Sequence, residues 1–397
     1  MNPAQVEGPG LAQVLAAALD RNGGRLTASP DQWRVLRALQ ACRTPALGGH
    51  WYRCQQCARD HFLPHPCGNR HCPQCQGAAA AKWLAAQEEL LLPIPYFHLV
   101  FTLPHSLNGL IRQNRAALYG LLFKTVSETL LQFGRERFGA EIGLTAVLHT
   151  WGQTLVDHYH LHCIVTGGGW NAGAKSWTPS HGRYLFPVRA LSVMFQGKYL
   201  AGLAQLQRRG KLQFHGDLVP LMAPAEFKNL LRKAASRSWV VYSKRPFAGP
   251  QQVLQYLGRY THRVALSPRR LRTLDPEAGT VRFEYKDYSD GGLRKTMTLK
   301  VEEFVRRFLL HVLPRRFSKI RHYGLLANRG RQQRVAEVQA VLGSVVAAIT
   351  VPTLEPPEAA PSEPKPLLCP HCKVGHLVWI RTVPRPRRKP VILTDSS

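Results

Sequence analysis

The spacing of apolar residues along the chain changes near residue 96. Before that point apolar side chains recur every three or four residues, as in Leu11, Val14 and Leu15, which is the period of an amphipathic helix. Pro30 and Asp31 open a second stretch of this kind, because proline is well tolerated in the first turn of a helix. We therefore expect residues 1–45 to form short helices that lead into a cysteine-rich segment.

After residue 96, strand-like and helix-like runs alternate. Runs rich in β-branched and aromatic residues predict strands at 96–103, 144–155, 160–166, 239–244, 281–288 and 293–299. Apolar positions with helical spacing predict helices at 114–133, 188–207, 224–236 and 250–263. This mixture predicts an α+β fold. A segment rich in proline and glutamate at 351–366 predicts a linker before a short basic tail.

The charge of the chain indicates a polyanionic partner. Its 53 lysines and arginines against 24 aspartates and glutamates give a formal net charge of +29, far more than solubility requires. A membrane surface is the competing polyanion. However, no apolar run approaches the roughly 18 to 20 residues of a bilayer span, and residues 1–10 lack a signal-peptide pattern. We therefore expect nucleic acid as the partner and no membrane.

The segment 259–335 combines 19 basic and seven acidic residues with aromatic ones. The aromatic residues considered are Phe283, Tyr285, Tyr288, Phe304, Phe308, Phe317 and Tyr323. Basic side chains with interspersed rings suit single-stranded nucleic acid, because the bases can stack on the rings. About half of these rings are expected to belong to the core whatever the function.

Five of the nine cysteines lie between residues 54 and 75. In a chain without an export signal, this density indicates metal ligation and not disulfides. Two Cys-x-x-Cys pairs separated by 14 residues have the spacing of a four-cysteine zinc site. We therefore predict one Zn²⁺ held by four thiolates, those of Cys54, Cys57, Cys72 and Cys75.

Other ligand choices stay open in this region. Several residues could replace a ligand or hold a second ion: Cys67, His50, His61, His65 and His71. Near the end of the chain, Cys369 and Cys372 supply half a site, with His371 or His376 as candidates to complete it.

His160 and His162 begin a predicted strand. Residues two apart on a strand share a face, so both imidazoles can bind one divalent ion. The preceding strand carries His149 and Gln153 at alternate positions, and a short turn near 156–159 would fold it back antiparallel. We predict Gln153 as a third ligand and keep His149 as the alternative. Asp157 is a weaker candidate because it falls in the expected turn.

Tyr256 and Tyr260 lie four residues apart in a predicted helix, so their phenols share one helical face. Half-buried packing residues would show the same spacing. Gly258 between them costs about 1 kcal/mol of helix stability relative to alanine, which suggests the close approach of another group to this surface. Donors suited to a phosphate surround the pair: Arg259, His262 and Arg263.

These motifs resemble those of the insertion-sequence transposases of the two-tyrosine HUH class, which move by a rolling-circle route. The matching segments, in the family's order, are Cys-Gly-Asn-Arg-His-Cys-Pro-Gln-Cys-Gln at 67–76, His-Leu-Val-Phe-Thr-Leu-Pro-His at 98–105, His-Thr-Trp-Gly-Gln at 149–153, His-Leu-His-Cys-Ile-Val at 160–165, Tyr-Leu-Gly-Arg-Tyr-Thr-His-Arg-Val at 256–264 and Arg-His-Tyr-Gly-Leu-Leu-Ala at 321–327. The resemblance covers residues 30–330. One departure is Tyr159, where such proteins often carry proline.

The resemblance implies that His160 and His162 hold Mg²⁺ or Mn²⁺ and that Tyr256 and Tyr260 are the nucleophiles. It implies an HUH-endonuclease-like antiparallel sheet with flanking helices at 96–335. A helical, zinc-binding DNA-contact domain is expected at 1–95, and a linker with a small Cys-x-x-Cys tail at 336–397. We expect an enzyme of the bacterial cytoplasm and nucleoid. It would nick and rejoin single-stranded DNA at insertion-sequence ends and targets through 5'-phosphotyrosyl intermediates.

Other functions could use the same residues. A plasmid or phage replication initiator, or a conjugative relaxase, would share the chemistry, although the chain has no Gly-x-x-x-x-Gly-Lys-[Ser/Thr] loop that would indicate a fused helicase. A non-catalytic zinc-finger regulator would bind DNA without cutting it. A metal hydrolase using His160, His162 and water would release 5'-phosphate and leave no protein–DNA adduct. The sequence does not determine the oligomeric state.

Overall fold

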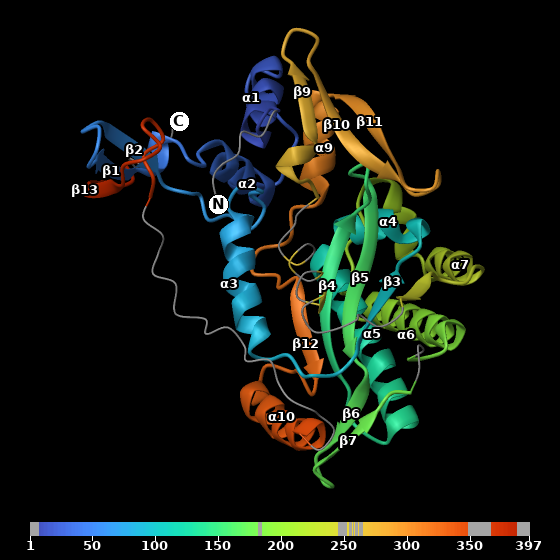
Figure 1. The fold of residues 1–397 in the computed structure, drawn as a ribbon. Coiled ribbons are helices and arrows are strands. Elements are labelled where there is room, and N and C mark those ends of the chain that lie inside the picture. Colours follow the sequence, from blue (N-terminus) through green and yellow to red (C-terminus); the bar gives the residue numbers. More distant parts are fainter. Residues whose placement is uncertain are drawn as a thin grey trace, which may run out of the picture.

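The centre of the protein is a five-stranded antiparallel sheet (Figure 1). The computed structural model describes residues 8–181, 185–244, 265–347 and 367–386, together with Gln252, Val253, Tyr256, Gly258 and Thr261. The strand order is β12-β4-β5-β3-β8, and every neighbouring pair is antiparallel. The strands are β3 (Tyr96–Thr102), β4 (Gly143–Trp151), β5 (Asp157–Thr166), β8 (Val241–Lys244) and β12 (Ile320–Gly324).

Alternation along these strands gives the sheet two chemically different faces. One face carries apolar residues such as Phe97, Phe101 and Leu161, which are fully buried against helices. These helices are α4 (Asn108–Gln113), α5 (Arg115–Phe138), α6 (Val188–Arg208) and α7 (Pro224–Ala235). The opposite face carries histidines, including His98 and His160. The face covered by helices therefore supplies the main core and leaves the other face for polar groups.

A third layer covers part of the histidine face. It contains α3 (Gln76–Glu88), α10 (Arg331–Ala347) and the helical positions Gln252, Val253, Tyr256 and Gly258. Val253 and Leu342 pack there with Ile164 of β5. The small hairpin of β6 (Gly168–Asn171) and β7 (Ser176–Pro179) borders this cluster through Trp170.

A second core joins the start of the chain to its later part. The helices α1 (Leu11–Arg21), α2 (Pro30–Gln40) and α9 (Val301–Leu310) pack with a three-stranded sheet of β9 (Leu271–Asp275), β10 (Thr280–Asp287) and β11 (Leu293–Lys300). Leu15 and Leu36 are buried in one cluster with Phe283 and Phe304. This core therefore crosses the predicted domain boundary near residue 95.

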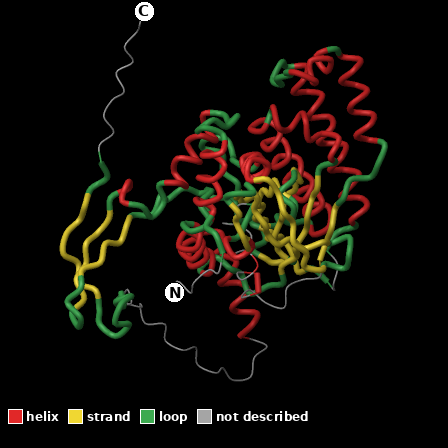
Figure 2. The backbone as a smooth tube through the Cα atoms, turned by 90° about the horizontal axis from the view of Figure 1, so that it is seen from above, coloured by secondary structure: helices red, strands yellow, loops and turns green. Residues whose placement is uncertain are grey.

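A third, small sheet has the order β13-β1-β2 and stands apart from the main body (Figure 2). Its strands are β1 (Gly49–Cys54), β2 (Asp60–Pro64) and β13 (Leu377–Val383). β13 pairs antiparallel with β1, so the last described strand joins the N-terminal module. In addition, α10 packs on the central sheet. Residues 336–347 and 367–386 therefore do not form the separate unit that the sequence predicts.

The predicted α+β class is confirmed, and most of the predicted elements occur within a few residues of their expected bounds. The strand expected at 144–155 ends instead at Trp151, because residues 152–156 form the turn to β5, with Leu155 at a positive φ of 63°. Asp157, expected in that turn, begins β5 and is buried, with Arg112 donating to its carboxylate. None of the helices in the described ranges combines the length and apolarity of a membrane span.

The aromatic contacts of the main core generate a stability prediction. Phe195 of α6 is fully buried between Phe101 of β3 and Trp239, with ring centroids 5.3 and 5.2 Å away. We expect Phe195→Ala to lower the free energy of unfolding by about 3–5 kcal/mol, because it removes these contacts and leaves a cavity. Urea denaturation followed by tryptophan fluorescence measures the change. Val193→Ala is the control, since Val193 lies on the same helix but is 70% exposed.

Candidate functional site

Three histidines from two neighbouring strands meet on the face of the central sheet opposite helices α4 to α7. His149 of β4 lies opposite His160 of β5, and His162 follows two residues later on the same face. One donor nitrogen from each lies within 4.8 Å of the others. The Nε2 atoms of His160 and His162 are 3.1 Å apart. Two ligands at right angles on an ion with bonds of about 2.1 Å lie about 3.0 Å apart, so this pair fits one small divalent cation.

The hydrogen bonds around the cluster orient the rings for metal binding. The Nδ1 of His160 is 2.9 Å from the backbone oxygen of His158 and donates to it, which leaves the Nε2 lone pair facing the cluster. Trp151 stacks on His149, with ring centroids 4.5 Å apart. This tautomer and this support are typical of histidines that bind a cation.

Burial keeps the imidazoles of His160 and His162 neutral. It lowers the pKa of His162 to about 3, with the nearby rings of His98 and His158 and the charge of Lys244 as smaller causes. Burial also lowers the pKa of His160 well below its ordinary value, and the neighbouring His162 adds to the effect. A neutral imidazole is the form that coordinates a metal. His160 and His162 can therefore accept a cation at neutral pH without first losing protons.

The side chain of Gln153 contacts the second sheet, whereas His149 lies within the cluster. The sequence interpretation continued the alternation of β4 through residue 153, but a bulge between His149 and Trp151 breaks it and the strand then ends. Gln153 lies in the following turn, where its Oε1 accepts from the backbone N–H of Lys286 at 3.5 Å. Its backbone oxygen accepts from Arg270. Gln153 thus connects the turn to the second sheet.

Tyr256 contacts the cluster directly. Its hydroxyl lies 3.0 Å from Nδ1 of His162 and 2.7 Å from Nε2 of His98. His98 stands on β3, and its own Nε2 is 2.9 Å from Nδ1 of His162. The phenol and the three-histidine cluster therefore share His162, which presents one ring nitrogen to each.

Two residues near Tyr256 were not singled out from the sequence. His98 belongs to the segment 98–105 that carries part of the family resemblance, and that membership was the available signal. Burial lowers its pKa to about 3, and the charge of Lys244 contributes. Lys244 lies opposite His98 in the β3–β8 register, so both side chains belong to the same face of the sheet. An isolated lysine at a strand end carries no signal in the sequence.

The helix that carries Tyr256 packs against α3. A Cβ atom on Gly258 would lie 2.7 Å from a methyl carbon of Leu84, so the close approach suggested by this glycine comes from the protein itself. Tyr256 and Val253 pack in the same cluster as Leu84. The other predicted members of this segment, Tyr260, Arg259, His262 and Arg263, lie outside the described residues.

The cysteines form two groups instead of one. The first contains Cys42, Cys67, Cys72 and Cys75, and the second contains Cys54, Cys57, Cys369 and Cys372. In each group the sulfur atoms lie within 4.8 Å of one another. The ninth cysteine, Cys163, is buried in the main core.

The four cysteines predicted to share one ion are therefore divided between the two groups. The spacing along the chain predicted that the two neighbouring Cys-x-x-Cys pairs would bind one ion. However, Cys54 and Cys57 lie at the turn between β1 and β2, in the small sheet and apart from Cys72 and Cys75. Cys42, at the end of α2, and Cys67 complete the first group, with sulfur distances of 3.5 and 3.6 Å to Cys75. Cys67 was among the alternative ligands considered from the sequence, whereas Cys42 belongs to no Cys-x-x-Cys pair and had no spacing that would mark it as a ligand.

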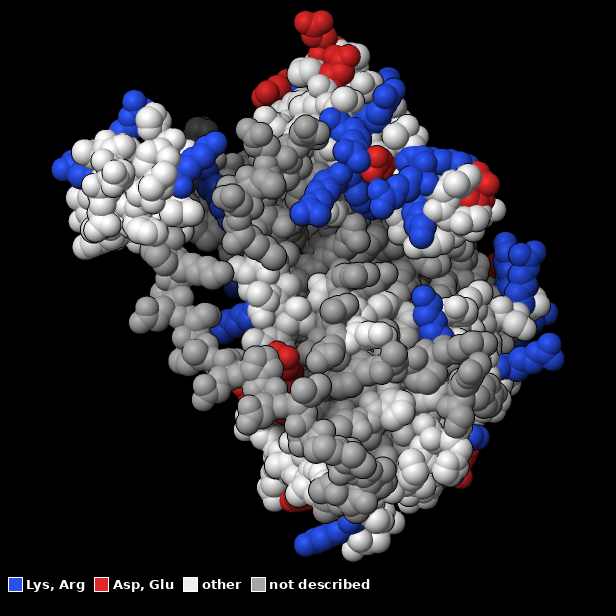
Figure 3. All heavy atoms as spheres, in the orientation of Figure 1, with Lys and Arg blue, Asp and Glu red and all other residues white. Residues whose placement is uncertain are grey.

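Basic side chains gather over the β9–β11 sheet (Figure 3). Arg282, Lys286 and Arg294 are exposed and share the outer face of β10 and β11. The ammonium group of Lys286 lies 5.5 Å from the ring centre of Tyr288, which is 69% exposed. By contrast, three of the predicted stacking rings are buried in the second core: Phe283, Phe304 and Phe308. The basic face is confirmed, but only part of its predicted aromatic surface is accessible.

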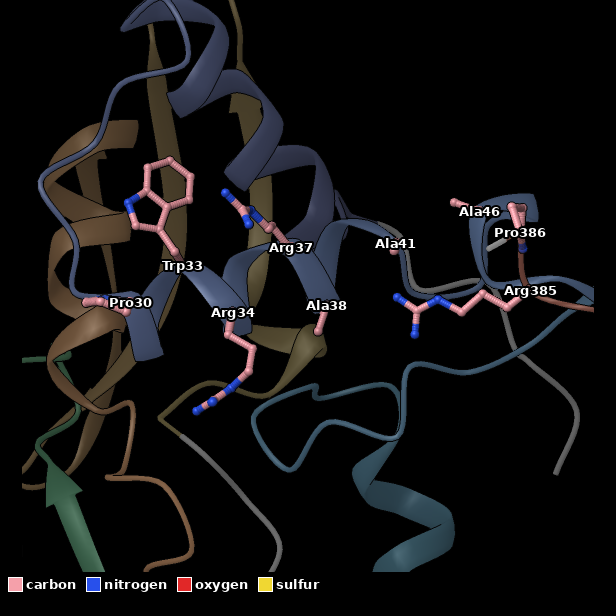
Figure 4. Close-up of a pocket in the computed structure, with 9 residues that line it drawn as sticks. All are labelled: Pro30, Trp33, Arg34, Arg37, Ala38, Ala41, Ala46, Arg385 and Pro386. Carbon is pink, nitrogen blue, oxygen red and sulfur yellow. The ribbon is translucent and has the colours of Figure 1, made fainter. Parts of the chain in front are cut away.

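A groove of about 910 Å³ lies between α2 and the end of the tail. Figure 4 shows Trp33, Arg34 and Arg37 projecting from α2, with Arg385 approaching from the segment that follows β13. Arg34 is paired with the exposed carboxylate of Asp31 at 2.8 Å, an ion pair that contributes little in water. Guanidinium groups can bind the phosphates of a nucleic acid, and an indole ring beside them can stack on its bases.

Comparisons with known proteins agree with these features. A family model described as "Putative transposase" matches residues 143–334, and one described as "Transposase zinc-binding domain" matches residues 13–103. The "Putative transposase y4qJ" of Sinorhizobium fredii (strain NBRC 101917 / NGR234) is 48% identical over 322 residues, which are 81% of this chain and 80% of that protein. No solved structure matches.

A second relative is the "Transposase for insertion sequence element IS801" of Pseudomonas savastanoi pv. phaseolicola. It is 29% identical over 310 residues, which are 76% of this chain and 72% of that protein. The zinc-binding match contains all four cysteines of the first group, and the cysteine groups fit bound zinc. A transposase binds DNA, and the family supports a nuclease and strand-transfer activity. The chain therefore belongs to the IS91 family of insertion-sequence transposases, the two-tyrosine HUH family that its motifs resemble.

Proposed function

We propose that this transposase nicks and rejoins single-stranded DNA through a covalent bond to Tyr256 or Tyr260, as rolling-circle transposition requires. The observation that supports it most directly is the 3.0 Å contact between the Tyr256 hydroxyl and His162, whose other nitrogen faces His160. A plasmid replication initiator or a relaxase would share this chemistry, but both relatives named above are described as transposases. A non-catalytic regulator would have no use for a phenol beside a cation site.

The proposed reaction is a transesterification at phosphorus. The phenolic oxygen forms a bond to phosphorus, the bond from phosphorus to the 3' oxygen breaks, and that oxygen leaves with a proton as a 3'-hydroxyl. The phenol loses its own proton in this step. Because the phosphotyrosyl bond conserves the phosphodiester, a 3'-hydroxyl can reverse the reaction and rejoin DNA without ATP. A second tyrosine allows a second strand to be held before the first is released.

His162 and His98 can hold the attacking hydroxyl in place. When a cation occupies the cluster, His160 and His162 both offer the lone pair of Nε2 to it, so the proton of neutral His162 lies on Nδ1 and can be donated to the oxygen of Tyr256. The Tyr256 hydroxyl then donates to Nε2 of His98 at 2.7 Å. With the hydrogen bonds in this direction, one lone pair of the Tyr256 oxygen remains free to attack phosphorus. Nε2 of His98 is then the acceptor for the phenolic proton.

A divalent cation fits the three histidines and leaves coordination positions for phosphate and water oxygens, which Mg²⁺ and Mn²⁺ prefer. When bound, it would polarise the scissile phosphate and stabilise the charge that develops on it. An unperturbed phenol has a pKa of about 10, so attack at neutral pH needs such assistance. The ammonium group of Lys244, on the same face, adds positive charge toward the phosphate.

The nucleophile assignment predicts the fate of covalent adducts. We expect Tyr256→Phe combined with Tyr260→Phe to reduce protein–DNA adducts below detection, because neither side chain can then attack phosphorus. Purified protein, a labelled single-stranded oligonucleotide carrying the insertion-sequence end and Mn²⁺ are incubated and resolved on a denaturing gel. Each single variant then reports which tyrosine reacts with that strand.

The matched control for these variants is Tyr199→Phe, which removes a hydroxyl from a fully buried tyrosine of the main core. It is expected to form adducts at the level of the unaltered protein. Adducts that persist in the double variant would refute the tyrosine assignment. Cleavage that yields free 5'-phosphate without any adduct would favour a hydrolase that uses water.

The third-ligand assignment predicts opposite effects for two nearby residues. We expect His149→Ala to weaken Mn²⁺ binding at least about tenfold, since it removes one of three nitrogen donors. Gln153→Ala is expected to leave the affinity unchanged, because Gln153 contacts the second sheet instead. Calorimetric titration of the zinc-loaded protein with Mn²⁺ measures both, with circular dichroism as the folding check. Loss of affinity in Gln153→Ala alone would restore the assignment made from sequence.

The basic surfaces predict the salt dependence of binding. We expect Arg282→Ala, Lys286→Ala and Arg294→Ala together to weaken single-stranded DNA binding. The slope of log K against log salt should fall by about 0.7 for each phosphate that the variant no longer neutralises. Fluorescence anisotropy at several salt concentrations measures the slopes, and Arg34→Ala with Arg37→Ala tests the groove in the same way.

A pair of exposed residues just after α6, Arg209 and Lys211, provides the control substitutions for both surfaces. Their replacement by alanine removes the same kind of charge from a part of the molecule outside the two surfaces. An equal loss of affinity and slope in this control would argue against both surfaces.

A further inference from the structure

We propose that Cys54, Cys57, Cys369 and Cys372 bind a second zinc ion that fastens the two ends of the chain together. The matched zinc-binding domain ends at residue 103, so two of these four ligands lie far outside it. The site would be structural, and it is independent of the proposed tyrosine chemistry. Its role would be to make the tail a permanent part of the N-terminal module.

The sulfur positions fit a tetrahedral ion. Cys54 lies 3.7 Å from Cys372, and Cys57 lies 3.8 Å from Cys369. Four thiolates at about 2.3 Å from one zinc ion are about 3.8 Å apart. A disulfide would need about 2.05 Å, so these pairs are not bonded to each other. A closed group of four sulfur ligands with no open position is the arrangement of a structural zinc site.

The two Cys-x-x-Cys turns have the same backbone shape. In the first, the N–H of Ala58 donates to the backbone oxygen of Cys54 at 3.0 Å, with Ala58 at a φ of 54°. In the second, the N–H of Lys373 donates to the backbone oxygen of Cys369 at 2.9 Å, with Lys373 at a φ of 59°. Positive φ is uncommon for residues other than glycine. Two distant segments adopt the same strained turn, which indicates a common constraint at each.

Backbone donors also point at the sulfur atoms. The N–H of Cys57 is 3.4 Å from the sulfur of Cys54, and the N–H of Gly375 is 3.3 Å from the sulfur of Cys372. His61 places Nε2 3.3 Å from the sulfur of Cys369. Such donors stabilise the thiolate form and act as the outer partners of metal ligands.

The tail turn is shaped around the N-terminal turn. A Cβ atom on Gly375 would lie 2.5 Å from the sulfur of Cys54, so no other residue fits there without movement. The backbone N–H of Gln55 donates to the backbone oxygen of His376 at 3.0 Å. The segment that precedes β13 therefore fits closely against Cys54 in both shape and hydrogen bonding. A chance contact between two chain ends would not be expected to fit in this way.

Apolar burial alone would hold β13 weakly. Three residues at the middle of this strand are well exposed: Val378 at 45%, Trp379 at 56% and Ile380 at 41%. Small modules with so little core depend on metal ligation for their folding free energy. Zinc at these four cysteines would supply the stabilisation that the sheet β13-β1-β2 lacks.

Metal counting tests the site. We expect the full-length protein to contain two zinc ions per chain by mass spectrometry of the metals. Cys369→Ala with Cys372→Ala should retain one, and Cys67→Ala with Cys75→Ala should also retain one. Cys163→Ala is the control, since Cys163 lies in the main core, and it should retain two. One zinc in the unaltered protein, two in the tail variant, or iron at the second site would overturn the proposal.

A cleavage experiment tests whether zinc holds the C-terminal segment on the N-terminal module. A site-specific protease sequence is inserted between residues 356 and 361, and the protein is cut after purification. We expect the C-terminal fragment to elute with the rest of the chain at the mass of one copy, and to separate after zinc is removed with a chelator. With Cys369→Ala and Cys372→Ala, the fragment should separate without a chelator. Separation of the unaltered fragment in zinc, or elution at the mass of two copies, would refute closure within one chain.

Discussion

The antiparallel pairing of β4 with β5 is the constraint on which the rest of the structure depends. It places His149 opposite His160 on one face, while Leu148 and Leu161 pair on the other and enter the main core. A slip of one residue would move every side chain of a strand to the other face, placing imidazoles in the apolar core and leucines among the histidines. The burial of the apolar face therefore fixes the position of the polar one, and the geometry of the histidines follows from the hydrophobic core beneath them.

The same logic explains why the histidine face can remain chemically active. Helices α5 and α6 bury the apolar side chains on one face of the sheet. The opposite face carries polar side chains, so it does not have to be covered completely. That cover comes from segments far apart in the sequence, including α3 and the helix with Tyr256, which meet through Leu84 and Gly258. The N-terminal module is thereby in direct contact with the helix of the proposed nucleophile.

Local patterns predicted the secondary structure and part of the site. The pair His160 and His162 could be identified because two-residue spacing on a strand determines a shared face, and Tyr256 because of its helical spacing to Tyr260. The prediction for Gln153 assumed that alternation along β4 continues, but it stops at a bulge that no local pattern revealed, and the Gln153 side chain contacts Lys286 instead. His98 and Lys244 could be assigned to the site only once β3 was placed beside β5 and β8 beside β3. The cysteine grouping failed for a related reason, since it depends on a strand pairing between β1 and β13.

The distance along the chain between the two halves of the second cysteine group has a consequence for synthesis. Cys57 and Cys369 are 312 residues apart, and translation at about 5 to 20 residues per second leaves roughly 15 to 60 s between the appearance of one and of the other. During that interval Cys54 and Cys57 have been synthesised but Cys369 and Cys372 have not. The core that contains α5 and α6 can already form in this time. Arg385, which borders the groove beside α2, is set in place only after that delay. A chain that ended before residue 367 would therefore lack both β13 and Arg385, and the groove beside α2 would lose that side of its lining.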